Sequence, residues 1–128
     1  MLSVVTFRHR GNFKKTERFL NALKGQRYLN ALDQYGQMGV DALAANTPVR
    51  TGLTASSWTY EIERTGTYTR ISWLNTNTVQ NVNIAVILQY GHGTGTGGYV
   101  AGTDYINPAM KPIFDTISEG VWREVTSL

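Results

Sequence analysis

The chain of 128 residues contains no cysteine. This absence excludes a disulfide framework and a metal site built on thiolates. It agrees with assembly in a reducing compartment such as a bacterial cytoplasm. Histidine is scarce as well: His9 and His92 are the only two, and neither has a carboxylate at the spacing of a metal-binding motif. We therefore predict no metal site and no cofactor.

Motifs of catalysis are lacking too. Ser56 and Ser57 have no Gly-x-Ser-x-Gly elbow around them. The acidic residues are scattered, and nothing in their spacing brings two carboxylates into one cleft for acid–base chemistry. We predict no catalytic residue and expect that the chain is not an enzyme.

Long apolar segments are also missing. The longest run, residues 84–88, is far too short to span a bilayer, and residues 1–7 do not have the pattern of a secretion signal. The hydrophobic share of 41% is nevertheless enough for a core. The length suits one domain rather than two. We expect a single soluble domain, residues 1–128, without a membrane partner.

Hydrophobic periodicity predicts a strand and two helices in the N-terminal half. Residues 2–7 alternate as in a short β-strand, and residues 12–24 have helical spacing. A longer helix is expected over about residues 27–45 and ends before Pro48. Its apolar face is predicted to contain Tyr28, Leu32, Tyr35, Met38, Ala42 and Ala45.

Two glycines interrupt that face. Gly36 and Gly39 each cost about 1 kcal/mol relative to alanine in a helix interior. They indicate either a point where the helix bends or the close approach of another backbone, and we favour close packing.

The C-terminal half is predicted to contain a hairpin and a second set of helices. Alternation at residues 58–62 and 70–74 predicts an antiparallel β-hairpin. Residues 84–90 fit a helix or a buried strand, and we favour a short helix. A final helix begins near Pro108 and buries Met110, Ile113, Phe114, Ile117, Val121 and Val125. The expected fold class is α+β: a short N-terminal strand, two helices, an antiparallel β-hairpin sheet and a C-terminal helix packed on the sheet.

The glycine-rich segment 91–98 invites comparison with a phosphate-binding loop. Such loops follow a strand, lead directly into a helix and usually include a lysine. No Lys or Arg lies between Arg70 and Lys111, and the segment leads into Tyr99 and Val100 rather than into a helix. We favour a mobile surface loop.

Basic residues cluster near the N-terminus, at Arg8, Arg10, Lys14, Lys15 and Arg18. They could bind nucleic-acid phosphates. A solvated helix face explains them without a partner, and no base-stacking aromatics are interleaved. A small nucleic-acid-binding module that uses this basic helix remains the alternative function. A third hypothesis is a small hydrolase or toxin that uses His92.

Four segments occur in an order that resembles a known family. They are residues 9–17 (HRGNFKKTE), 47–52 (TPVRTG), 84–93 and 104–109 (DYINPA). Together they resemble the tail-component family of long-tailed bacteriophages, whose members are called minor capsid, neck or tail-completion proteins. The resemblance covers nearly the whole chain. The family usually has an acidic residue where Arg50 stands and often an aliphatic one where Thr54 stands.

The resemblance implies a structural virion protein. Its subunits would form a homo-oligomeric ring at the head–tail junction, with six copies, or twelve in a layer nearer the portal. The partners would be other neck and tail proteins of the phage or prophage. DNA would pass through the lumen without specific binding, and the ring would be assembled in the host cytoplasm.

A ring requires each subunit to present two different faces, because its interface is heterologous. Edge strands and extended loops supply such faces, and aromatic residues are enriched at their centres. Tyr90, Tyr99 and Tyr105 flank the glycine-rich segment, where core packing is the competing explanation. The predicted subunit or partner interface consists of Thr47, Pro48, Val49, Arg50, Thr51, Gly52, Tyr90, Gly91, His92, Gly93, Thr94, Tyr99 and Tyr105.

Overall fold

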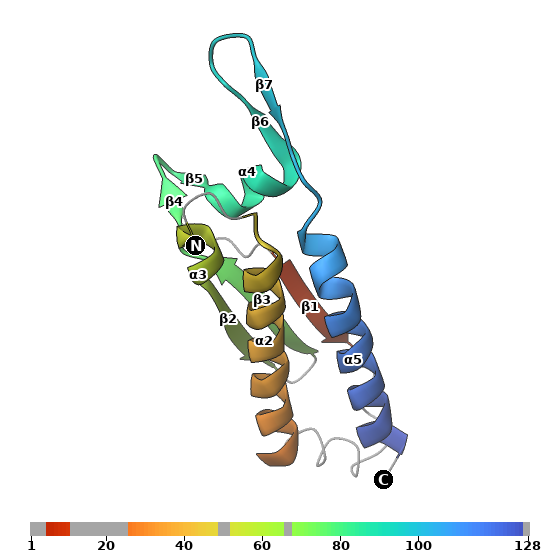
Figure 1. The fold of residues 1–128 in the computed structure, drawn as a ribbon. Helices are drawn as coiled ribbons and strands as arrows, with labels where there is room; N and C mark the ends of the chain where they lie inside the picture. The colour runs from red at the N-terminus through yellow and green to blue at the C-terminus, as the bar shows by residue number, and fades with distance from the viewer. Residues whose placement is uncertain (1–4, 11–25, 49–51, 66–67, 127–128) are drawn as a thin grey trace.

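Two long helices lie against an antiparallel sheet, and a hairpin projects from one end (Figure 1). The computed structural model describes residues 5–10, 26–48, 52–65 and 68–126. The predicted helix over residues 12–24 and the segment 49–51 lie outside the described residues. In chain order the elements are β1 (Val5–Arg10), α2 (Gln26–Asn46), α3 (Leu53–Ser56), β2 (Trp58–Arg64), β3 (Tyr68–Asn75), β4 (Thr78–Val79), β5 (Val82–Asn83), α4 (Ile84–Tyr90), β6 (Gly91–Gly93), β7 (Tyr99–Ala101) and α5 (Ile106–Thr126).

The main sheet has the strand order β1-β3-β2, and both pairs are antiparallel. Trp73 of β3 stands opposite Val5 on one side and Tyr60 on the other. The predicted N-terminal strand is confirmed, but β1 ends at Arg10, three residues beyond the predicted end, and residues 2–4 lie outside the described residues. The hairpin is confirmed too, and β2 and β3 are longer than the alternating segments 58–62 and 70–74. The α+β class is confirmed as well, since α2 and α5 pack together over one face of this sheet (Figure 1).

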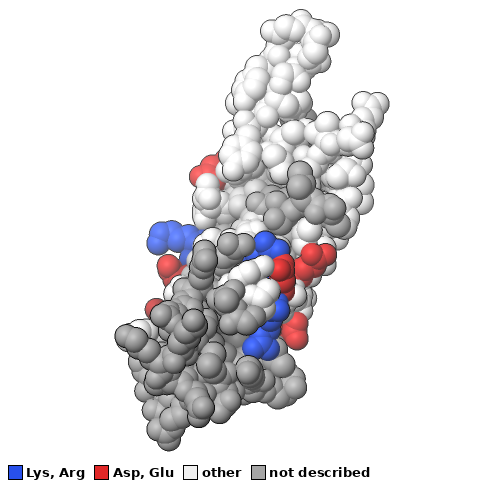
Figure 2. All heavy atoms as spheres, turned by 180° about the vertical axis from the view of Figure 1, so that it is seen from behind, with Lys and Arg blue, Asp and Glu red and all other residues white. Residues whose placement is uncertain are grey.

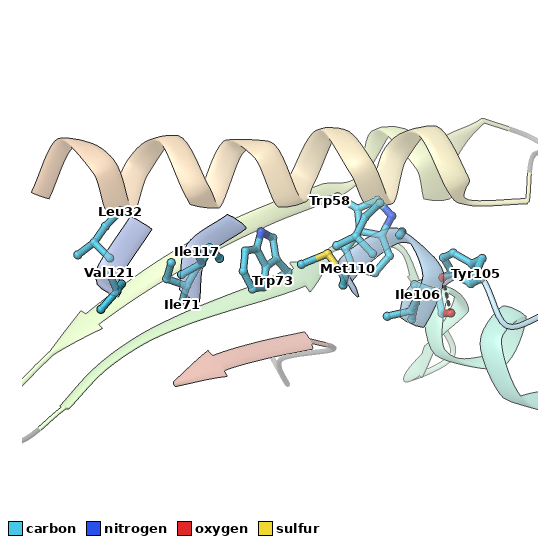
Figure 3. Close-up of a cluster of buried hydrophobic side chains, with 12 residues drawn as sticks. Leu32, Trp58, Ile71, Trp73, Tyr105, Ile106, Met110, Ile117 and Val121 are labelled. Carbon is cyan, nitrogen blue, oxygen red and sulfur yellow. Dashed lines mark hydrogen bonds between the residues drawn. The ribbon is translucent and has the colours of Figure 1, made fainter. Parts of the chain in front are cut away.

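The core lies between that sheet face and the two helices (Figure 3). Its largest fully buried side chain is Trp73, which lies with Ile71, Leu43, Met110 and Ile117 in the interior. Alternation places Ile71 and Trp73 on the same face of β3, toward the helices. Burial of these side chains supplies the main driving force for folding.

Gly36 and Gly39 allow α2 to approach the sheet. A Cβ added to Gly36 would overlap the Tyr60 ring, and one added to Gly39 would overlap the Trp73 indole. Close packing at these glycines is present as expected, but the expected approach of another backbone is wrong. The neighbour is an aromatic side chain rather than a second backbone, because the rings of the sheet fill the space that a side chain on α2 would take.

The buried face of α2 differs from the predicted one. It runs along Leu32, Gly36, Gly39 and Leu43, at helical spacing, whereas Ala45 is exposed. The prediction followed large apolar residues only. Glycine adds no hydrophobic signal to a sequence pattern, so the true centre of the face was missed.

Segments 75–105 form the upper end of the molecule in Figure 1. The short helix α4 is confirmed at residues 84–90, and the Asn83 side chain caps it by accepting a hydrogen bond from the Ala85 amide. The polar segment before it contains the small β4–β5 hairpin. Its two turn residues, Gln80 and Asn81, have positive φ angles of 50° and 66°, as a type I′ turn requires.

The prediction of a surface loop over the whole glycine-rich segment 91–98 is wrong in part. Residues 91–93 are not loop: they form β6, which pairs with β7 so that only residues 94–98 turn between them. A Cβ on Gly91 or on Gly102 would overlap main-chain atoms of the opposing strand end. Glycine at these two positions lets the ends of the β6–β7 hairpin approach each other closely, although glycine weakens a strand because it has no side chain to pack.

Helix α5 begins at Ile106, two residues before Pro108, and covers the core with its predicted apolar face. Met110, Ile117 and Val121 are buried, while Ile113 and Phe114 are half-buried. Val125 lies where side chains are not described. Within the described residues no helix is both long and apolar enough to cross a lipid bilayer.

Candidate interaction surface

In the described part of the chain, the Tyr60 and Tyr105 hydroxyls make hydrogen bonds within the subunit. No group of three His, Cys, Asp or Glu side chains lies together there as a metal site would need. Burial raises the pKa of Tyr105 to about 12, and its hydroxyl donates a hydrogen bond to the Ala85 carbonyl at 2.6 Å. The pKa of Tyr60 is raised by partial burial and by its hydrogen bond to Asp33.

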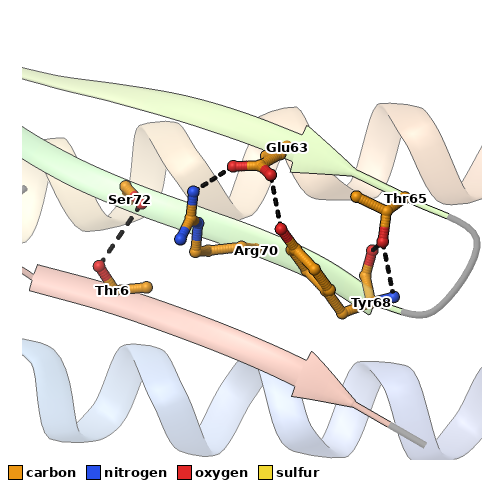
Figure 4. A network of polar contacts seen from close by, with 6 residues as sticks. All are labelled: Thr6, Glu63, Thr65, Tyr68, Arg70 and Ser72. Carbon is orange, nitrogen blue, oxygen red and sulfur yellow. Dashed lines mark hydrogen bonds and ion pairs between the residues drawn. The ribbon is translucent and has the colours of Figure 1, made fainter.

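The sheet face turned away from α2 and α5 carries a paired polar network (Figure 4). Glu63 accepts hydrogen bonds from Arg70 and from the Tyr68 hydroxyl, and the Thr6 and Ser72 hydroxyls meet at 3.5 Å. Cross-strand pairs of this kind stabilise a sheet. The carboxylate of Glu63 is thus engaged in cross-strand pairing.

The end of the molecule that carries the β6–β7 hairpin differs from this charged sheet face. Residues 71–103 include no Lys, Arg, Asp or Glu. They form most of the end that carries the β6–β7 hairpin, and on the side seen in Figure 2 the described atoms of the hairpin region are white, without Lys, Arg, Asp or Glu. Protein surfaces in contact with water normally carry charge, so this end is unusual.

Large hydrophobic side chains are exposed at this same end. Tyr90 is 71% exposed and Tyr99 67%. The remaining exposed ones near them are Leu53, Val79, Val82 and Val100, whereas Trp122 lies far along α5. We call this set, together with the uncharged residues between its members, the apolar end surface. Large apolar side chains that are exposed together at one end of a protein mark a candidate site of interaction.

The β6–β7 hairpin, residues 91–101, projects from the apolar end surface, and we call it the arm (Figure 1). Gly91 pairs with Ala101 and Gly93 with Tyr99. The turn is closed by Thr94, whose amide donates to the Gly98 carbonyl at 3.0 Å and whose hydroxyl accepts from the Gly98 amide at 3.1 Å. Among the described residues the arm is a sheet of two strands, so both outer edges offer main-chain groups to a partner.

The base of the arm is fixed to the body. The buried Gln89 side chain accepts hydrogen bonds from the amides of Tyr105 at 3.0 Å and Ile106 at 2.9 Å, and it donates to Asp104 at 2.7 Å. The Thr103 amide donates to the Leu88 carbonyl. These contacts hold the two chain ends of the arm together, where α4 ends and α5 begins.

An apolar groove of about 370 Å³ lies beside the arm. Its walls are mainly Leu53, Val79, Ile84, Ile87 and Leu88, and His92 lines it from the base of the arm. Pro48 and Gly52 also border it. The volume falls within the range of ordinary binding pockets.

Asparagine side chains hold the walls of the groove in place. Asn75 is fully buried and donates to the Thr54 carbonyl at 2.8 Å. Asn77 donates to the Thr54 hydroxyl at 2.9 Å. Together they tie α3 to the end of β3, so that Leu53 of α3 and Val79 of β4 line a preformed groove.

Most of the predicted interface residues that the structure describes belong to this end. Tyr90, His92, Gly93, Thr94 and Tyr99 are exposed. Gly91 is half-buried at the base of the arm, and Pro48 and Gly52 border the groove. Val49, Arg50 and Thr51 lie outside the described residues.

Two predicted interface residues are interior instead. Thr47 is 2% exposed: its hydroxyl donates to the Leu43 carbonyl at 2.6 Å and accepts from the Trp58 indole at 2.9 Å. Tyr105 is 4% exposed and packs in the core. Both side chains satisfy polar groups within the subunit, so we remove them from the surface set.

The exposed aliphatic residues of this end were missed from sequence. Leu53, Val79, Val82 and Val100 lie in short or irregular elements, where periodicity carries no information on burial. The signal that could have found them is the charge-free run of residues 71–103.

Comparisons of the chain with protein-family models, with curated proteins and with solved structures gave no significant match.

Proposed function

We propose that this chain is a structural virion protein of a long-tailed phage or prophage, which forms a ring at the head–tail junction or tail end around the DNA channel. The observation that carries the proposal is the apolar end surface, an uncharged surface with a projecting arm and a preformed groove. Such a surface suits association with protein rather than a role in water.

The segments that resemble the phage family converge on this end of the subunit. Pro48 and Gly52 of segment 47–52 border the groove, segment 84–93 comprises α4 and the first strand of the arm, and segment 104–109 begins where the arm returns to the body. Only segment 9–17 lies mostly outside the described residues. Segments distant in sequence thus share one place in the fold, as parts of one interface would.

A ring is built from heterologous contacts that close by rotation. Each subunit needs one face that reaches out and another that receives, and the arm and the groove supply two such different faces. Six copies is our expectation, with twelve for a layer nearer the portal. Other neck and tail proteins would bind above and below the ring.

The test is to measure the mass of the purified protein in solution as its concentration rises, by size-exclusion chromatography with light scattering, and to image the product by negative stain. We expect closed rings at high concentration, or rings that form on isolated tails or heads. A protein that stays monomeric at every concentration and binds neither tails nor heads contradicts the proposal.

A further inference from the structure

We infer that the arm of one copy inserts into the apolar groove of a neighbouring copy, with Tyr99 as its anchor and Tyr90 packed at its base. The inference rests on the proposed function in one respect, that the occupant of the groove is a second copy of this chain. It adds which two surfaces meet and which residues hold them.

The arm has the features of an inserted ligand. Its turn, residues 94–98, consists of threonine and glycine only, so its tip is narrow. Behind the tip stands Tyr99, whose hydroxyl donates to the Tyr90 main-chain carbonyl at 2.8 Å and so fixes the direction of an exposed ring. Tyrosine combines large contact area with little loss of side-chain freedom, and it is enriched at the centres of interfaces.

The groove has the matching chemistry. Its rims, Leu53 and Val79, are more than half exposed, and its floor consists of aliphatic side chains of α4. A charged occupant would lose its hydration there without gaining an ion-pair partner among the described lining residues, which is costly. An apolar occupant that carries no charge fits, and the arm, like the rest of residues 71–103, has none.

The arm does not fill the groove of its own subunit. Tyr90 and Tyr99 remain 71% and 67% exposed, and of the arm only His92 lines that groove. The hydrogen bonds of Gln89 to Tyr105 and Ile106 fix the direction in which the arm leaves the body. Insertion therefore requires a second molecule, and each subunit gives one arm and receives one.

The area involved predicts how strong the contact is. An aromatic side chain buries about 150–250 Å². Two of them with their groove stay near or below the lower size of stable interfaces, about 1,200 Å² in total. One arm–groove contact is accordingly weak, whereas a closed ring gains from having every subunit held on both sides.

Engineered cysteines give a direct test, because the natural chain contains no thiol. One variant has Thr96→Cys at the tip of the arm, and a second, made distinguishable by a size tag, has Val79→Cys on the rim of the groove. The two are mixed at high concentration and treated with a short bis-maleimide. The matched control replaces the groove variant by Ser118→Cys, an exposed position in the C-terminal half of α5.

We expect the mixed arm–groove product in a yield at least about tenfold above the control. A yield no greater than the control overturns the inference. In that case, rings imaged by negative stain would still support the proposed function, with a different interface between the subunits. The failure of the inference and the failure of the proposed function can therefore be told apart. Because cross-linking traps brief encounters, the result does not depend on a stable ring of the isolated protein.

A complementation experiment tests the direction of the contact. Tyr99→Ser removes the anchor of the arm, and Val79→Asp places a charge in the groove. Each variant alone is expected to need at least about tenfold more protein to associate, as loss of an interface anchor implies. Mixed, they retain one intact arm and one intact groove and should form dimers that do not grow.

Two controls separate binding from folding. Tyr99→Phe keeps the anchoring ring and loses only the hydrogen bond to the Tyr90 carbonyl, so it should associate far more strongly than Tyr99→Ser. Trp122→Ala removes an equally exposed aromatic residue from α5, outside the apolar end surface, and should associate like the natural chain. The inference is contradicted if Tyr99→Ser and Val79→Asp are folded by circular dichroism and still associate as strongly as the natural chain.

Discussion

The indole nitrogen of Trp73 donates a hydrogen bond to the main-chain carbonyl of Gly36 at 2.8 Å, and Trp73 is fully buried. A side chain at the centre of the sheet is thus bonded to the middle of α2. The same indole ring fills the space that a side chain at Gly39 would take. The bond satisfies a buried indole N–H and holds α2 at the distance that only glycine permits.

Replacing Gly39 by alanine should therefore destabilise the fold. The new Cβ would overlap the Trp73 indole, which cannot move aside because its nitrogen is bonded to Gly36. Overpacking of this kind costs about 1–3 kcal/mol. The gain in helix propensity is about 1 kcal/mol, so we expect a net loss of up to about 2 kcal/mol. Urea denaturation followed by tryptophan fluorescence measures the difference. Gln34→Ala, at an exposed position on the same helix, should change the free energy of unfolding by less than about 0.5 kcal/mol.

Gln89→Leu should loosen the base of the arm. The substitution leaves the amides of Tyr105 and Ile106 without their acceptor in a buried place. Each orphaned donor costs about 1–3 kcal/mol. We expect a lower free energy of unfolding, and a larger increase in hydrogen exchange over the natural chain in residues 91–106 than in β3. Equal exchange in the variant and the natural chain would show that the arm is held by other contacts.

Tyr105 should make stability fall at alkaline pH. Its pKa is raised by burial to about 12, above the ordinary value of 10.0. The unfolded chain therefore releases this proton at lower pH than the folded chain, so the contribution of Tyr105 to stability is complete below pH 10 and is lost between about pH 10 and 12. Tyr105→Phe should show a shallower loss of stability in this window, measured by urea denaturation at several pH values.

The same variant also tests the hydrogen bond to Ala85. Tyr105→Phe leaves that carbonyl without the hydroxyl at 2.6 Å and should cost about 1 kcal/mol at neutral pH. Tyr90→Phe is the matched control, because the Tyr90 side chain is exposed and its loss of a hydroxyl should change neither quantity.

The DNA-binding alternative predicts a different outcome from ours. A channel protein lets DNA pass, so we expect no measurable binding of duplex DNA at physiological salt and no difference when Lys14 and Lys15 are both replaced by Glu. A binding constant that falls steeply with salt, and that the double variant abolishes, would support the nucleic-acid-binding module instead. Fluorescence anisotropy over a salt series decides between the two.

Elements whose residues carry their own periodic signal could be predicted from the sequence. The alternation around Trp58 and Trp73 indicated the hairpin, and Pro48 marked the end of α2 within two residues. The short helix α4 was correctly chosen over a strand. The candidate surface was found only in part, through the tyrosines and glycines of the arm.

The α+β class and the approximate position of the regular elements follow from the sequence alone, because apolar spacing and turn residues act locally along the chain. Tertiary structure alone decided that Gly36 and Gly39 face the core, that Thr47 and Tyr105 lie inside, and that residues 91–93 pair with 99–101. The reason is physical. Glycine, threonine and tyrosine suit either the interior or the surface, and the space and hydrogen-bond partners that settle the choice come from segments far away in the sequence.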